Sequence, residues 1–183
     1  MKRQVLMLVI LCTTQMAFAQ KYMTRTGKIS FFSSTPVEKI EAFNNETACI
    51  LDSKSGDILF QASIKSFKFE KELMQEHFNE DFMQSDKYPK SDFKGKVTNI
   101  SSINFSKDGS YPATVAGKLT IHGVTHDVSV PGTIVVKGND ITTNAKFQVK
   151  LADYNIKVPS MMTSKVAEKM EITVNSILSQ VNK

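Results

Sequence analysis

The 183-residue sequence contains no tryptophan, and Arg3 and Arg25 are its only arginines. Its lysines are scattered among carboxylates, and the formal net charge is +5 at pH 7. Nucleic-acid-binding domains instead concentrate lysine and arginine on one face. The composition therefore indicates that nucleic acid is not a partner of this protein.

Cysteine is also scarce, because Cys12 and Cys49 are the only two. Two cysteines are too few for a disulfide framework, and Cys12 lies in a segment that we expect to be removed. The fold must then be held together by packing. Cys49 lies in an alternating segment, which favours a small buried apolar residue over a nucleophile.

A long apolar run occurs only at the N-terminus. Residues 5–12 are apolar, Lys2 and Arg3 precede them, and the small-x-small triplet 17–19 follows. A positive start, a short apolar run and small residues at the end are the three parts of a secretory signal peptide. We therefore predict that residues 1–19 are a signal peptide, cleaved after its last residue.

The remaining residues, 20–183, are expected to form one domain with its own core. None of their stretches is apolar over the length that a membrane-spanning helix needs. The alternative at the N-terminus is a lipoprotein signal acylated at Cys12, but Leu11 stands where such signals carry a small residue. We expect an exported protein that is periplasmic or secreted.

Alternation of apolar and polar residues indicates strands that have one dry face and one wet face. It is clearest in the segments 57–65, 93–98, 114–122, 145–151 and 171–178. Turn-forming residues occur between the strands, at 53–56, 107–110, 122–123 and 137–140. Many short strands at even spacing predict an antiparallel sandwich or barrel, and the periodicity does not choose between them.

Two segments depart from the strand pattern. In residues 70–79, apolar side chains stand four apart, which predicts a short amphipathic helix. A second short helix is expected within residues 160–169, before the last strand.

Motifs of nucleophilic catalysis and of phosphate binding are absent from the sequence. His77, His122 and His126 are its only histidines. His122 and His126 flank a turn and could meet as two metal ligands, but no third ligand is apparent. We favour hydrogen bonds from these imidazoles to the backbone, and we predict no metal, no cofactor and no enzymatic activity.

The dry faces carry a surplus of large apolar side chains, with twelve phenylalanines in the chain. In a sandwich these side chains would fill the core, whereas in an eight-stranded barrel the same faces can enclose one small ligand. Periodicity supports a packed core and a ligand cavity equally. The candidate lining residues are Phe31, Ile58, Phe60, Ile64, Phe93, Val97, Val115, Leu119, Ile121, Phe147 and Val149.

Two stretches resemble the YceI-like, or polyisoprenoid-binding, family. The stretch LTIHGVTHDV at 119–128 resembles the family's central L-T-I-H-G-V-T hairpin. Residues 76–82, followed by Tyr88-Pro89 and Phe93, resemble its H-L, D-F, Y-P, F block. The order and spacing agree over about residues 28–174. Where many relatives carry an Arg-Asp pair this chain has Met74-Gln75, and residues 40–44 replace an early glycine-rich segment.

The resemblance implies an all-β fold, an extended antiparallel β-barrel of about eight strands that is lipocalin-like, with one or two short helices. It also implies an exported protein without a catalytic site. Its partner would be an apolar lipid held inside the barrel, such as a polyisoprenoid, a quinone or a fatty-acid-like chain, and a homodimer is compatible with this function. Two alternatives are a structural or stress-related secreted barrel without ligand and a small histidine-dependent enzyme.

Overall fold

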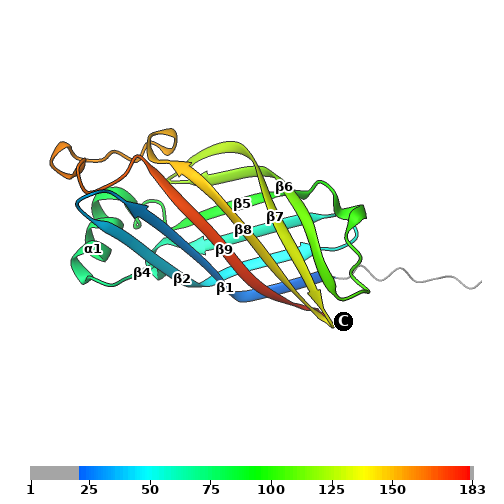
Figure 1. The fold of residues 1–183 in the computed structure, drawn as a ribbon. Helices are drawn as coiled ribbons and strands as arrows, with labels where there is room; N and C mark the ends of the chain where they lie inside the picture. The colour runs from blue at the N-terminus through cyan, green and yellow to red at the C-terminus, as the bar shows by residue number, and fades with distance from the viewer. Residues whose placement is uncertain (1–20, 182–183) are drawn as a thin grey trace, which may run out of the picture.

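A computed structural model describes residues 21–181 of the chain. The predicted signal peptide at 1–19 lies outside the described residues, and its removal stays a prediction. The described part is an elongated antiparallel barrel with its α-helix at one end (Figure 1). The predicted all-β barrel is therefore confirmed.

The barrel is built from long strands that follow one another up and down. Each pairs antiparallel with the next long strand along the chain, and β1 pairs with both β2 and β9, which closes the sheet. The long strands are β1 (Lys21–Ser34), β2 (Lys39–Asp52), β3 (Asp57–Ser63), β5 (Lys90–Val97), β6 (Gly109–Ile121), β7 (Val124–Lys137), β8 (Asp140–Lys150) and β9 (Lys169–Gln180). The two-residue strand β4 (Lys68–Phe69) pairs with β2.

The segment between β3 and β5 contains the principal helix. Helix α1 (Glu72–His77) continues into a π-helical turn, Phe78–Phe82, which confirms the helix predicted in residues 70–79. Short 3₁₀ turns occur at Ile64–Ser66, Ile100–Ser102, Leu151–Tyr154 and Ser160–Met162. The predicted strand 57–65 therefore ends earlier, at Ser63.

The second predicted helix, within residues 160–169, is wrong, since only the 3₁₀ turn Ser160–Met162 forms there. The backbone N–H of Leu151 donates to the carbonyl of Glu168, at 3.0 Å, and Ala167 N–H donates to Ser33 Oγ, at 3.1 Å. These bonds hold residues 167–168 beside β1 and the end of β8. Between them and the 3₁₀ turn, the chain makes only a hydrogen-bonded turn, in which the N–H groups of Lys165 and Val166 donate to the carbonyl of Met162.

One end of the barrel is packed solid. Tyr22 at the start of β1, Leu51 near the end of β2 and Leu178 near the end of β9 are almost completely buried there. Phe105, from the connection between β5 and β6, stacks on Tyr22 with ring centroids 5.7 Å apart. We call this cluster the floor; its buried members are Tyr22, Cys49, Leu51, Ile58, Val97, Ile103, Ala113, Ile134, Val136, Ile141 and Leu178.

Cys49 belongs to this floor and is fully buried. Burial raises the pKa of the Cys49 thiol far above its ordinary value, because the surrounding side chains cannot solvate a thiolate. The residue therefore packs as a small apolar side chain, as the alternation predicts.

Gly95 and Gly117 face each other across β5 and β6. A Cβ built on Gly117 would lie 2.3 Å from the carbonyl oxygen of Lys94, and one on Gly95 would lie 2.3 Å from that of Ala116 and 2.8 Å from the Phe93 ring. Neighbouring backbone atoms thus lie too close to either position to leave room for a side chain, and only glycine fits there. This close approach bends the wall of the barrel, as barrel closure requires.

Alanine at Gly117 is therefore expected to lower the free energy of unfolding by about 1–3 kcal/mol, because the added methyl meets backbone that cannot move aside cheaply. Gly109→Ala, on the same strand, is the matched control, since its Cβ would make only ordinary 3.4 Å contacts with the Tyr111 ring. Urea unfolding of both variants measures the difference. Equal losses in the two variants would show that the close approach of β5 and β6 does not constrain the fold.

Candidate functional site

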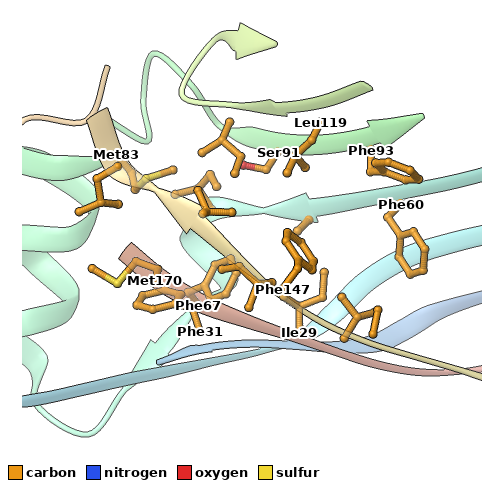
Figure 2. Close-up of a pocket in the computed structure, with 18 of the residues that line it drawn as sticks. Ile29, Phe31, Phe60, Phe67, Met83, Ser91, Phe93, Leu119, Phe147 and Met170 are labelled. Carbon is orange, nitrogen blue, oxygen red and sulfur yellow. The ribbon is translucent and has the colours of Figure 1, made fainter. Parts of the chain in front are cut away.

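Beyond the floor, the inward side chains do not meet. They enclose a cavity of about 480 Å³ that extends from the floor to the end of the barrel carrying α1. Figure 2 shows phenylalanine, leucine, isoleucine and methionine side chains that point into this space from opposite walls. The wall is almost entirely apolar, and Ser91, from β5, contributes one of its few hydroxyl groups.

Ten of the eleven residues predicted from the sequence lie in this wall. The predicted residues that line the cavity are Phe31, Ile58, Phe60, Ile64, Phe93, Val115, Leu119, Ile121, Phe147 and Val149. Val97 does not line it, because it lies at the floor end of β5 and is packed in the floor cluster, 2% exposed. That these lining residues bind a lipid stays a prediction, and their positions in the wall allow it to be tested by substitution.

Sequence reasoning missed other lining residues, among them Ile29 on β1, Val130 on β7 and those that come from residues 65–89. Phe67, Phe69 and Phe78 cluster with Phe31, with ring centroids between 5.0 and 5.7 Å apart in the contacting pairs. Phe67 and Phe69 lie in a stretch too short to show a period. The spacing in residues 70–79 placed Phe78 on the apolar face of a helix, but it did not show that this face covers the cavity. The density of phenylalanine in an otherwise polar stretch was the available indication.

Polar side chains gather where the cavity opens, which we call the mouth. Lys71, which precedes α1, forms an ion pair of 3.1 Å with Glu38 of the β1–β2 turn, and both line the cavity. His77 of α1 and Lys165 of the connection before β9 also line it. The cavity is therefore closed and apolar at the floor, and polar where it opens.

His122 and His126 bind the backbone, as the sequence favoured. Nδ1–H of His122 donates to the carbonyl of Tyr154 at 3.2 Å, and Nε2–H of His126 donates to that of Asp153 at 2.7 Å. Each ring nitrogen must carry the hydrogen, because a carbonyl oxygen only accepts. The two histidines thus tie the β6–β7 hairpin to the 3₁₀ turn Leu151–Tyr154, and neither is among the residues that line the cavity.

The two stretches that carry the family resemblance meet in space. His122 and Gly123 both have positive φ, 50° and 75°, which suits a tight hairpin turn between β6 and β7. The ring of Tyr88 packs edge-on against His122, with centroids 4.5 Å apart, and a Cβ on Gly123 would lie 2.6 Å from it. The carbonyl of Pro89 accepts a hydrogen bond from the N–H of Ile64. These residues brace the mouth end of the barrel.

Within residues 21–181, His, Cys, Asp and Glu side chains form no group of three or more that could hold a metal ion. No helix in this same range is long and apolar enough to cross a membrane.

A closed up-and-down barrel with an apolar interior belongs to the architectural class that includes the lipocalins, in which the barrel can hold one small ligand. Residues 13–177 match the YceI-like domain, and the chain belongs to this family of binding domains. No curated protein matches the sequence.

Solved structures with similar folds include three bacterial proteins. A polyisoprenoid-binding domain from Saccharophagus degradans, implicated in plant cell wall breakdown, is 10% identical with a TM-score of 0.78, covering 89% of this chain and 99% of that one. BcnA of Burkholderia cenocepacia is 21% identical with a TM-score of 0.69, covering 82% and 95%. The Campylobacter jejuni YCEI protein is 18% identical with a TM-score of 0.58, covering 78% and 85%. At these identities the likeness establishes the fold.

Proposed function

We propose that this protein is exported and holds one long apolar lipid inside its barrel, for transport, storage or sequestration, without catalysing a reaction. The lipid is a polyisoprenoid, a quinone or a fatty-acid-like chain. The observation that carries this proposal is the cavity of about 480 Å³ with its apolar wall. Its volume lies in the range of small-molecule sites, roughly 300–1,000 Å³.

The energetics of the cavity favour an apolar occupant. Each methylene moved from water into the apolar wall stabilises the complex by about 0.8 kcal/mol. At about 24 cal/mol per Å³, a dry, unfilled space of 480 Å³ would forfeit on the order of 10 kcal/mol of packing. That loss is comparable to the whole stability of an ordinary domain, roughly 5–15 kcal/mol. A bound lipid would therefore stabilise the fold as well as occupy the site.

The layout of the cavity supports an amphiphilic ligand with its polar end at the mouth. The floor is packed, so a tail can extend only from the mouth toward Ile58 and Ile134. Lys71, His77 and Lys165 line the cavity at the mouth, where a polar head would lie.

Three further observations support the remaining parts of the proposal. The similar S. degradans domain is a polyisoprenoid-binding domain. The sequence pattern of residues 1–19 supports export. His122 and His126 are engaged with backbone carbonyls away from the cavity, which argues against a role for them in catalysis.

The proposal is tested by purifying the protein without detergent, extracting it with organic solvent and analysing the extract by mass spectrometry. We expect an apolar molecule in near-equal molar amount. Val174→Trp replaces two methyl groups with an indole ring that projects into the cavity, so this variant should carry less of the apolar molecule. Ile177→Trp, on the exposed outer face of the same strand, should carry as much as the wild type. Repeated wild-type extracts without any apolar molecule would overturn the proposal.

A further inference from the structure

Large apolar side chains are exposed at the mouth end of the barrel. Val37 is 61% exposed, Leu73 is 60% exposed and Met161 is 85% exposed. They belong to the β1–β2 turn, to α1 and to the connection between β8 and β9, which are far apart in the sequence. Figure 1 shows these three segments at the same end of the barrel, the connection in orange.

These side chains lie at the rim of the cavity. Leu73 itself lines the cavity, and so do Glu38 and Met162, the immediate neighbours of Val37 and Met161. Each of the three exposed side chains therefore belongs to a segment that also contributes to the wall of the cavity. Single exposed apolar side chains are common, but three that group around the opening of one ligand cavity favour an interaction surface.

The charges around the mouth limit what the covering surface can be. The segments 35–39, 64–90 and 151–169, which form this end, contain nine lysines and nine carboxylates between them. This end as a whole therefore has no net charge from these groups that would attract a strongly charged partner. The connection that carries Met161 has Lys157 and Lys165 but no carboxylate between residues 154 and 167, so its tip can approach lipid headgroups without like-charge repulsion from phosphate.

We propose that the mouth end docks onto a phospholipid bilayer, with Val37, Leu73 and Met161 inserted at the boundary between headgroups and acyl chains. Docking would let a lipid pass between the bilayer and the cavity without its tail crossing water. The proposal rests on the proposed function, because it supplies the route by which an apolar ligand reaches a closed barrel. Insertion of a few side chains gives reversible binding, which suits delivery or collection.

A bilayer fits these features better than a second protein surface. Protein interfaces need a central patch from which charged residues are depleted. Here the three exposed side chains stand on separate segments and alternate with charged residues, such as Glu72 and Glu76 on α1. A bilayer can accommodate separate apolar anchors while the charges between them remain in the hydrated headgroup layer.

Flotation of the purified protein with phosphatidylcholine vesicles tests the proposal. We expect the wild type to float with these vesicles, with little further gain from added phosphatidylglycerol and little loss at about 1 M salt, where charges are screened beyond ~3 Å. The double variant Val37→Asp, Met161→Asp, at two exposed side chains that do not line the cavity, should reduce the bound fraction about tenfold or more. Ile177→Asp, which changes a side chain that is 60% exposed on β9, is the control and should bind like the wild type.

Three outcomes would overturn docking: full vesicle binding by the double variant, equal loss in Ile177→Asp, or binding that requires phosphatidylglycerol and disappears in salt. If the wild type does not bind vesicles but forms dimers, and the double variant is monomeric, this surface would instead be an interface with a second copy of the chain.

Loading of a fluorescent long-chain fatty acid separates docking from lipid holding. The double variant should load normally from detergent micelles, which bring the ligand in soluble form, and slowly from vesicles. If no protein loads from either source while the wild type still binds vesicles through Val37 and Met161, lipid holding fails and docking stands. Equal loading rates from vesicles for wild type and double variant would overturn docking alone.

Discussion

Aspartate in place of Phe147 is expected to abolish lipid retention while the barrel stays folded. Phe147 projects from β8 into the cavity and is paired across the sheet with Ile172, another lining residue (Figure 2). A carboxylate there would keep water inside the cavity unless a bound apolar tail displaced that water. Displacing it would cost free energy, because the charged group would then have no hydrogen-bond partner. We expect lipid affinity to fall on the order of 100-fold, about 2.8 kcal/mol at 1.4 kcal/mol per tenfold.

Phe43→Asp is the matched control for this variant. Phe43 is 48% exposed on the outer face of β2, so the same chemical change leaves the cavity untouched. Lipid content by mass spectrometry and the urea midpoint are measured for both proteins. Retained lipid in Phe147→Asp, or equal loss in both variants, would contradict a binding role for this wall. If Phe147→Asp does not fold, Val174→Trp tests the same cavity without burying a charge.

The faces of the strands could be predicted from the sequence because the alternation of a strand is a local property. Ile58 and Phe60 on β3, and Leu119 and Ile121 on β6, all face inward as predicted. The position of a residue along the barrel axis, in contrast, does not follow from local alternation. Phe93 and Val97 share one face of β5 and are four residues apart, yet Phe93 lines the cavity and Val97 is packed in the floor.

The part of the wall contributed by the segment between β3 and β5 depends on tertiary contacts that sequence periodicity does not reveal. Phe67 and Phe78 reach the cavity because the irregular segment that carries them folds back over the barrel. The connection after β8 fails to form the predicted helix because its end is held to Leu151 and Ser33 by hydrogen bonds. In both places the local sequence was compatible with another structure, and packing against distant strands decided the outcome.

The residues behind the family resemblance divide between two tasks in this chain. Gly123 leaves room for the ring of Tyr88, and His122 and His126 hold the turn that follows β8. These contacts shape the mouth without lining the cavity. The same stretch also contributes to the wall, because Leu119, Ile121 and Val128 line the cavity. A sequence motif can therefore combine residues that hold a turn with residues that face the ligand space.

The division of the barrel into a packed floor and a hollow upper part predicts two different costs for one substitution. Ile141→Ala removes a fully buried side chain from the floor and leaves a new cavity, so the free energy of unfolding should fall by about 3–5 kcal/mol. Ile172→Ala only enlarges a space that already exists, so the lipid-free protein should lose about 1–2 kcal/mol, mainly from transfer of the removed atoms.

Urea unfolding of the two variants, with and without bound lipid, measures this difference. Lipid should increase the loss caused by Ile172→Ala, since the side chain then has a partner in the cavity, and should leave the loss caused by Ile141→Ala unchanged. Equal losses in the lipid-free protein would mean that the upper part of the barrel is packed like the floor. In that case its wall would stabilise the fold and leave no room for a hydrocarbon chain, because a side chain and a ligand cannot occupy the same volume.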